Sequence, residues 1–235
     1  MLSPVLFIAF LGGVLPALLW LAFWLLEDRL HPEPKRYIFF CFLAGMFAVP
    51  FVLPVERFIL AQALSVGYAS TSLVVLFLWA LSEELFKFAA AYFVALRSRV
   101  FDEPLDAIVY LVTAALGFSA AENMLFLLNP LLAGNILQSI VTGDLRFIGA
   151  MLLHTLSSAT IGLALAVSYY QGARARRLAA LCGVVLAVTL HTAFNFFILG
   201  SGSGATFWIF LVIWLGIVAI LLGAERVKRP LPHYS

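Results

Sequence analysis

The sequence predicts an all-α membrane protein, a polytopic bundle of about seven transmembrane helices with its N-terminus outside and its C-terminus in the cytoplasm. Hydrophobic residues make up 64% of the 235 residues and charged residues only 11%, and the mean hydropathy is +1.07. Soluble domains average roughly 45–50% apolar and about 25% charged residues, so this chain has too little polar surface to face water. The composition excludes a disordered chain, a disulfide-stapled secreted domain and a nucleic-acid-binding protein with a broad basic face.

Seven apolar stretches cover most of the chain, and each approaches or exceeds the length of about 20 residues that a bilayer-spanning helix needs. The first is expected to be an uncleaved signal anchor, because it has no basic region before its apolar run and no small-residue cleavage site. The seven stretches are residues 3–26, 37–55, 71–96, 105–128, 146–170, 178–199 and 205–223.

Short turns rich in Pro, Gly and charged residues separate most of these stretches, at residues 31–34, 102–104, 172–174 and 200–204. Two connections are longer and semi-polar, residues 54–70 and 129–145, and the second has room for an interfacial or re-entrant segment. The sequence shows no internal repeat and no soluble segment. We therefore expect residues 1–235 to form one transmembrane domain.

Positive residues predict the orientation, because cytoplasmic loops carry an excess of Lys and Arg. Eleven of the fourteen Lys and Arg residues fall in alternate connections and in the C-terminal tail, which are thereby assigned to the cytoplasm. Arg57 and Arg146 fall on the other side, and Lys87 lies inside a span. The eleven are Arg29, Lys35, Arg36, Arg97, Arg99, Arg174, Arg176, Arg177, Arg226, Lys228 and Arg229. The resulting orientation requires an odd number of spans, which agrees with seven.

Four of the predicted spans contain polar groups that are costly in a bilayer. A charged side chain at the centre of a membrane helix costs roughly 2.5–3.5 kcal/mol on insertion scales. Such residues face the interior of the bundle, and by default they mark function. They are Glu83, Glu84 and Lys87 in the third span, Glu122 and Asn123 in the fourth, His154 in the fifth, and His191 and Asn195 in the sixth.

These polar groups share one predicted depth. At about 1.5 Å of rise per residue, Glu83 lies near the centre of its span. Glu122, His154 and His191 each lie a few residues beyond the centre, toward the predicted outside. Because successive spans alternate in direction, four separate stretches place their polar groups in one layer, in the outer half of the membrane.

The spacing within the helices predicts which side chains meet. Glu83 and Lys87 are four residues apart and are expected to pair on one helix face, whereas Glu84 points about 100° away. His191 and Asn195 have the same spacing and are expected to project into one cavity. Two His and one or more Glu suit Zn²⁺, with a second Glu as general base. The same groups also suit water activation by a Glu–His pair without a metal, so both chemistries stay open.

Three other interpretations compete with a hydrolytic site. Single intramembrane His, Asn or paired Glu and Lys residues often serve only helix packing. Buried Glu, His and Lys residues also build the proton relays of transporters, which usually show internal pseudo-symmetry or broken helices. A non-catalytic assembly subunit is the third alternative. The occurrence of three Glu and two His at one depth on four helices favours a working site.

At these residues the sequence resembles the PrsW family of intramembrane proteases, which is distantly related to the CAAX-processing and bacteriocin-processing proteases. The resemblance covers roughly residues 24–199 and consists of short motifs in a fixed order. They are Glu83-Glu84 with Lys87, Asp106-Ala107 with Tyr110, Phe118 with Glu122-Asn123, His154, and His191 with Asn195, and the turn Pro32-Glu33-Pro34 resembles the family's first cytoplasmic loop.

The resemblance implies that peptide bonds are hydrolysed within or beside the membrane. It implies a single-span membrane protein substrate, such as a membrane-anchored anti-sigma factor, which is cleaved on the extracytoplasmic side. It also implies a multi-pass protein of a bacterial or archaeal cell membrane, whose partners are its substrate and lipids and include no nucleic acid.

For the mechanism, the resemblance leaves a zinc enzyme and a metal-free glutamate protease open. In a glutamate protease, Glu83 or Glu84 is the general base and His154 helps to activate water. His191 and Asn195 then line the oxyanion site. The remaining residues have supporting roles. Glu122 is a second carboxylate or, in a zinc enzyme, a metal ligand together with His154 and His191. Lys87 balances the charge of the Glu that is not catalytic, and Asn123 lies beside Glu122.

Overall fold

The computed structural model describes residues 2–27, 31–200 and 203–228, and all regular elements in these ranges are helical. Arg29 and Arg229, which contribute to the predicted orientation, lie outside the described residues. The helices are α1 (Leu2–Glu27), α2 (Lys35–Ser65), α3 (Leu73–Ala91), α4 (Asp106–Leu132), α5 (Ile136–Leu145), α6 (Met151–Val167), α7 (Ala173–Gly200) and α8 (Ser203–Lys228), with π-helical turns at Tyr92–Leu96 and Arg146–Ala150.

Each of the seven predicted stretches coincides with a helix, which confirms the all-α fold. In the described part of the chain, six helical segments are long and apolar enough to cross a membrane: α1, α2, α4, α7, α8, and α5 with α6 as one segment. Helix α3 does not qualify, because its 19 residues include Glu83, Glu84 and Lys87. The structure therefore gives six candidate spans against the seven predicted, and the difference falls on the helix with the most buried charge.

The two connections are shorter than predicted, because most of their residues are helical. Helix α2 continues through Pro50 and Pro54 to Ser65, which leaves a short connection before α3. Membrane helices tolerate internal prolines when the freed backbone groups find other partners. In residues 129–145, α4 ends at Leu132, a tight turn follows, and α5 runs to Leu145. An interfacial or re-entrant position of this segment stays a prediction.

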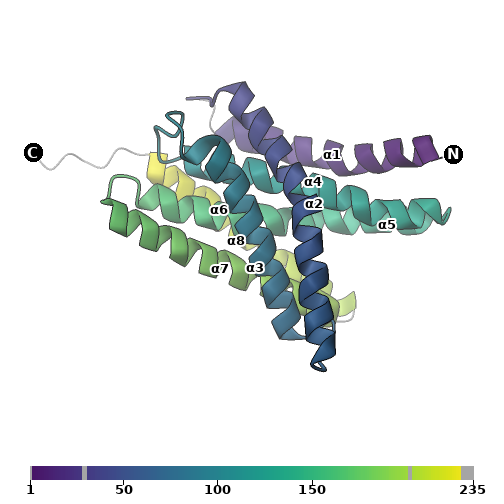
Figure 1. Ribbon diagram of the computed structural model, residues 1–235. Coiled ribbons are helices and arrows are strands. Elements are labelled where there is room, and N and C mark those ends of the chain that lie inside the picture. Colours follow the sequence, from purple (N-terminus) through teal and green to yellow (C-terminus); the bar gives the residue numbers. More distant parts are fainter. Residues whose placement is uncertain (1, 28–30, 201–202, 229–235) are drawn as a thin grey trace, which may run out of the picture.

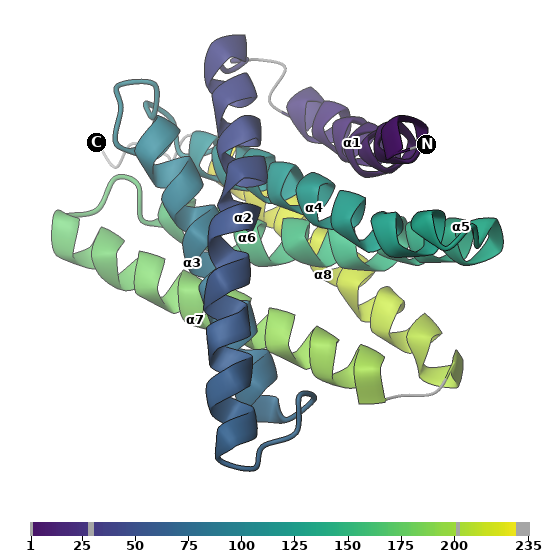
Figure 2. The same cartoon turned by 45° about the vertical axis from the view of Figure 1, so that its right-hand side comes forward.

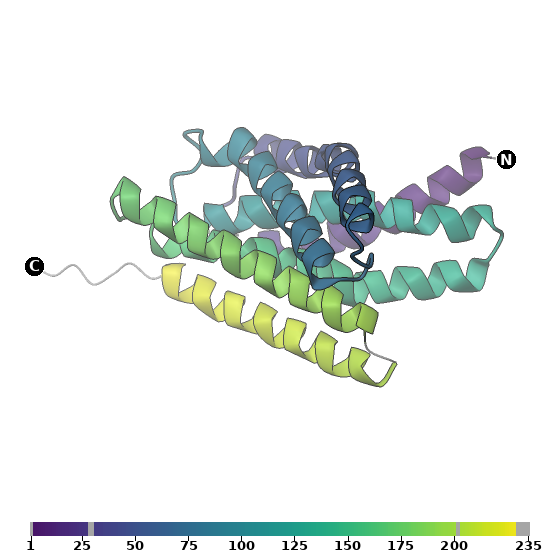
Figure 3. The same ribbon diagram turned by 60° about the horizontal axis from the view of Figure 1, so that its bottom comes forward.

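The turn between α4 and α5 has clear local causes. Gly134 adopts a φ of +71°, in the left-handed region that glycine enters without a steric penalty. The side chain of Asn135 then accepts a hydrogen bond of 3.0 Å from the backbone N–H of Gln138 and caps α5. Helices α4 and α5 consequently form a hairpin whose tip extends past α2, α3, α7 and α8, on the same side as the start of α1 (Figure 3).

Helix α4 is the centre of the bundle. Its residues from Asp106 to Ala120 are all buried, on every face of the helix. Helices α1, α2 and α6 pack directly against it. In Figure 1, α4 and α6 run side by side, and α2 and α3 cross them at a steep angle. Figure 2 shows α7 below this crossing, where it reaches α3, and α8 running behind α4 and α6. The polar residues of α3, α4, α6 and α7 are thereby brought to one interior region.

Glycines allow the close helix crossings that define this region. A Cβ atom on Gly45 of α2 would lie 2.0 Å from the backbone oxygen of Ala114, and one on Gly117 of α4 would lie 2.0 Å from that of Phe42. The backbones of α2 and α4 therefore touch directly at their crossing, as small residues permit in membrane helices. Gly162 of α6 meets the backbone of α4 in the same way, since its Cβ would lie 2.6 Å from the Cα atom of Ile108.

A separate polar cluster fixes the start of α4. The carboxylate of Asp106, the first residue of α4, accepts backbone N–H bonds from Asp102 at 2.9 Å and from Glu103 at 2.8 Å. The buried hydroxyl of Tyr110 donates a hydrogen bond to Glu33 in the loop before α2. These contacts link the turn before α4 to the loop before α2.

Candidate active site

The candidate active site gathers polar side chains from four helices that are far apart in the sequence. Helix α3 contributes two carboxylates and an ammonium group, and α4, α6 and α7 face it with a carboxylate and two imidazoles. Glu83, Glu84, Lys87, His154 and His191 are all buried, and Glu84 and Lys87 have no exposed surface. The structure therefore brings these residues together in one contiguous cluster, as the sequence predicted.

Glu84 is the most extensively bonded member of the cluster. Its Oε1 atom lies 2.6 Å from Lys87 Nζ and 2.8 Å from both His191 Nδ1 and Ser157 Oγ. The hydroxyl of Ser158 reaches its second oxygen at 3.4 Å. Both oxygens of Glu84 are therefore engaged by donors from α3, α6 and α7, and this carboxylate holds the three helices together.

The predicted pair of Glu83 and Lys87 is wrong, because Lys87 binds Glu84 instead. Residues three apart on a helix are neighbours as well as residues four apart, so either carboxylate was within reach. The Lys87 ammonium also donates to His154 Nδ1 at 2.9 Å and lies 5.1 Å from the centroid of the Phe118 ring. These partners on α6 and α4 draw Lys87 to the Glu84 side of α3.

The hydrogen-bond partners define the state of each imidazole. The Glu84 carboxylate only accepts, so Nδ1 of His191 carries a proton, and in the neutral ring Nε2 then has the free lone pair. The ammonium of Lys87 only donates, so Nδ1 of His154 is the acceptor. The other nitrogen of His154, Nε2, then donates to Glu122 Oε2 at 3.0 Å.

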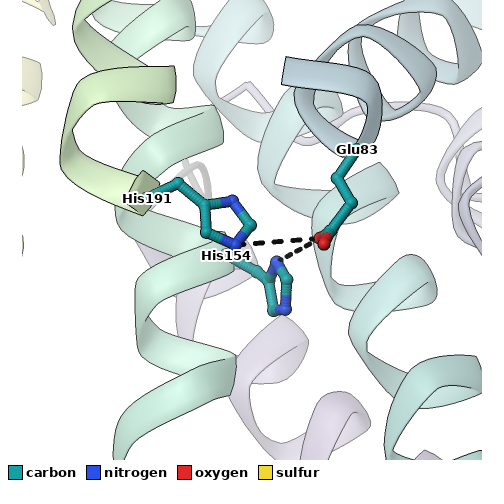
Figure 4. Close-up of side chains that lie close together, drawn as sticks. All are labelled: Glu83, His154 and His191. Carbon is teal, nitrogen blue, oxygen red and sulfur yellow. Dashed lines mark ion pairs between the residues drawn. The ribbon is translucent and has the colours of Figure 1, made fainter. Parts of the chain in front are cut away.

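Glu83 occupies the space between the two imidazoles. Its Oε2 atom lies 3.8 Å from His154 Nδ1 and 3.8 Å from His191 Nε2. That oxygen is buried and has no hydrogen-bond partner among the described residues. Figure 4 shows the Glu83 carboxylate facing both rings, which stand almost perpendicular to each other, at 86°. An unpaired buried oxygen is costly, so this position calls for a ligand, a proton or a water molecule.

The three groups around Glu83 fit a metal ion. The donor atoms of Glu83, His154 and His191 lie within 4.8 Å of one another, and they are the one such group in the described part of the chain. Two ligands of a tetrahedral zinc ion lie roughly 3.5 Å apart, so the three atoms need only a small contraction. Each imidazole is also oriented by a carboxylate on its other nitrogen, as in many zinc sites. The contact of Lys87 with His154 Nδ1 would have to be given up.

Glu122 lies on the opposite side of the His154 ring from Glu83. Its Oε2 atom bonds to His154 Nε2, and the same oxygen forms an ion pair with Arg146. The structure therefore gathers Glu83, rather than Glu122, with the two imidazoles, which differs from the ligand set expected from the sequence. Glu122 is placed to orient an imidazole instead.

The two asparagines have different surroundings. The side-chain oxygen of Asn123 accepts a hydrogen bond from Arg146 Nε, so this residue belongs to the neighbourhood of Glu122. Asn195 is half-buried one helical turn after His191 and makes no side-chain hydrogen bond with another described residue. That Asn195 projects into one cavity with His191 stays a prediction.

Comparison with known proteins identifies the family. Residues 33–222 match the family model described as "PrsW family intramembrane metalloprotease". The chain belongs to the PrsW family of intramembrane metalloproteases.

Relatives that carry the name Protease PrsW support this assignment over nearly the full length. The protein of Clostridioides difficile is 25% identical over 95% of this chain and 92% of its own, and that of Oceanobacillus iheyensis is 28% identical over 93% and 94%. The protein of Geobacillus kaustophilus is 32% identical, and there the alignment spans about half of each chain, 50% of this one and 51% of the relative. No solved structure matches the chain. As a PrsW protein with six candidate spans, it is a multi-pass membrane protein.

Three residues at the candidate site were not predicted from the sequence. Glu56 of α2 brings its carboxyl group to that of Glu83, but it falls in the segment that was assigned to a connection. Arg146 was counted only as a topology signal, although it binds Glu122 and Asn123. Ser157 lies three residues after His154, a helical spacing that could have indicated a shared face.

Proposed function

We propose that this PrsW protein is an endopeptidase that hydrolyses peptide bonds of membrane-anchored proteins at the cluster of Glu83, His154 and His191. The observation that carries the proposal is the buried Oε2 atom of Glu83, which faces two imidazole nitrogens and has no hydrogen-bond partner among the described residues. Groups arranged in this way bind and activate water. The whole of residues 1–235 is proposed to act as one protease domain, since one core cluster contains buried residues of α1, α2, α4, α6, α7 and α8.

Glu83, His154 Nδ1 and His191 Nε2 are the atoms that would hold a zinc ion. When bound, such an ion lowers the pKa of a water molecule and polarises a carbonyl group. Glu84 keeps His191 in the form whose Nε2 lone pair points to Glu83, and Glu122 does the same for Nδ1 of His154. The two carboxylates therefore define the orientation of both rings with or without the ion.

The roles of the two neighbouring glutamates follow from their surroundings. Both oxygens of Glu84 are taken up by donors, so Glu84 has no free oxygen to receive a proton from water. Glu83 has such an oxygen, and it is the carboxylate that we propose to act on water. Asn195, with its half-buried amide near His191, is proposed to donate a hydrogen bond to the oxygen of the scissile carbonyl.

The proposed substrate is a single-span membrane protein, anti-sigma-factor-like, cleaved on the extracytoplasmic side. The burial of the site among helices long enough to cross a membrane supports a scissile bond within or beside the membrane. The excess of positive residues at the connections after α1, α3 and α6 and in the C-terminal tail supports the orientation.

A comparison of protein N-termini in cell membranes tests the proposal. Cells that produce the wild-type protein are compared with cells that produce Glu83→Gln, and Glu225→Gln, an exposed glutamate of α8, serves as the matched control. We expect new N-termini in or beside single membrane spans in wild-type and Glu225→Gln cells, and their loss in Glu83→Gln cells. Identical sets of N-termini in all three would overturn the proposal.

A further inference from the structure

Arg146 lies at the edge of the candidate site and contacts three residues of α4. Its guanidinium pairs with Glu122 Oε2 through one terminal nitrogen, and its Nε donates to the side-chain oxygen of Asn123. The guanidinium carbon lies 3.9 Å from the centroid of the Phe126 ring. The side chain is only 14% exposed, although the residue was expected at a membrane surface.

A π-helical turn brings Arg146 to this position. Arg146 is the first residue of the turn Arg146–Ala150 that joins α5 to α6, and His154 follows eight residues later. In an unbroken α-helix, residues eight apart differ by about 80° around the axis. A π turn closes i→i+5 bonds and winds fewer degrees per residue, which removes part of that difference. Arg146 and His154 can therefore both approach Glu122 from one helical segment.

The site contains two parallel chains of a cation, a carboxylate and an imidazole. Lys87 binds Glu84, which binds His191, and Arg146 binds Glu122, which binds His154. In each chain the far nitrogen of the imidazole faces Glu83 Oε2. The first chain lies within the family motifs quoted above, whereas Arg146 lies outside them.

We propose that Arg146 is a positioning residue, which fixes the Glu122 carboxylate on Nε2 of His154 and thereby aims Nδ1 of His154 at Glu83. The proposal rests on the proposed function for its catalytic consequence, but the geometry itself can be tested without a substrate. The guanidinium is suited to this role because its planar fork serves two acceptors at fixed angles, Glu122 and Asn123. A lysine side chain carries the same positive charge, but it has no planar group that can serve two acceptors at fixed angles.

A double-mutant cycle separates action through Glu122 from a general structural effect. We expect Arg146→Ala to lower kcat about 10–100-fold with little change in KM, as loss of an orienting partner does. In the Glu122→Gln background, Arg146→Ala should cause no further loss. Arg146→Lys should fall between wild type and Arg146→Ala, and it keeps the proposal testable if the alanine variant does not fold. The rates are measured on a membrane protein found in the N-terminus comparison.

Arg57→Ala is the matched control, because Arg57 is the other Arg on the same predicted side, is exposed and lies outside the site. Its cleavage rate should equal that of wild type. A loss in Arg57→Ala as large as that in Arg146→Ala would overturn the proposal, since the effect would then belong to net charge. Full additivity of Arg146→Ala and Glu122→Gln would overturn it as well.

The substrate-free measurement is the NMR signal of the Nε2 proton of His154 in ¹⁵N-histidine-labelled protein. In wild type this proton is hydrogen-bonded to a carboxylate and should resonate far downfield and exchange slowly with water. Arg146→Ala should shift it upfield and speed its exchange, as should Glu122→Gln. An unchanged signal in Arg146→Ala would overturn the proposal. If wild type cleaves no protein, the proposed function fails while this measurement still decides the role of Arg146.

Discussion

Glu83 and Glu84 are consecutive residues of α3, yet their carboxylates have opposite surroundings. Glu84 is bonded through both oxygens to side chains of α3, α6 and α7, whereas Oε2 of Glu83 is buried without a hydrogen-bond partner among the described residues. Since consecutive helical residues point about 100° apart, one carboxylate faces the α6–α7 packing and the other faces the space between the imidazoles. Their substitutions should therefore fail in different ways.

Glu84→Leu should destabilise the protein, because it leaves the fully buried Lys87 ammonium without its carboxylate. Breaking a buried ion pair from one side typically lowers the free energy of unfolding by about 3–5 kcal/mol. Glu83→Gln should abolish cleavage without loss of stability. Thermal unfolding in detergent measures both. The double variant Glu84→Leu/Lys87→Met should recover much of the stability and none of the activity, and a Glu84→Leu variant as stable as wild type would contradict the argument.

Metal binding should distinguish ligands from orienting residues. Alanine at Glu83, His154 or His191 should remove a bound zinc ion, whereas Glu122→Gln should only weaken its binding by about 10–100-fold. Zinc content and affinity of purified protein, measured by mass spectrometry and calorimetry, provide the test. Loss of zinc in Glu122→Gln as complete as in His154→Ala would restore the ligand set expected from the sequence. Cleavage by a wild-type protein that binds no metal would leave water activation to Glu83.

Glu56 should matter for activity through its contact with Glu83. Glu56→Leu removes the carboxyl group that interacts with that of Glu83 and should lower kcat by about 10-fold or more. Glu56→Gln should retain most activity, since an amide can donate a hydrogen bond to Glu83. Steady-state cleavage rates of the two variants give the comparison. Equal rates for Glu56→Leu and wild type would show that the contact has no catalytic consequence.

Gly117→Ala should destabilise the crossing of α2 and α4, because the added Cβ would lie 2.0 Å from the backbone oxygen of Phe42. Overpacking of this kind typically costs about 1–3 kcal/mol. The control is Gly143→Ala in α5, where the nearest atom, on Leu127, lies at 3.8 Å. An alanine there should be neutral or stabilising. Unfolding temperatures in detergent test both variants, and equal values would show that the backbones can separate freely.

Cysteine labelling should test the predicted orientation. With Cys41 and Cys182 replaced by serine, single cysteines at Ala69 and Gln171 occupy exposed turns on opposite sides of the predicted bundle. A membrane-impermeant maleimide should label position 69 in intact cells and position 171 only after permeabilisation. The reverse pattern would place the N-terminus in the cytoplasm.

The sequence predicted the helices well because hydropathy alone separates membrane helices from turns. It could not show where α2 ends, since Pro50 and Pro54 signal a break that the helix does not make. It therefore assigned Glu56 to a connection. It placed the conjunction of two His and three Glu correctly, because buried charges in a bilayer must meet one another.

Helical spacing alone could not predict which of these polar side chains bind one another. Spacing favoured Glu83 as the partner of Lys87, and only the packing of His154 and Phe118 around Lys87 selects Glu84. The π turn at Arg146–Ala150 changes the phase between α5 and α6, and nothing in the residue pattern announces it. Because the π turn could not be predicted, the contact between Arg146 and Glu122 could not be predicted either.

The two imidazoles and the carboxylate between them come from α3, α6 and α7, so no single hairpin contains more than part of the site. During synthesis the ribosome must complete α7 before His191 can join Glu83 and His154. A nascent chain that ends before α7 contains Glu83 and His154 but lacks His191. If these three residues form the active site as proposed, proteolytic activity requires every helix from α3 to α7 to be in place.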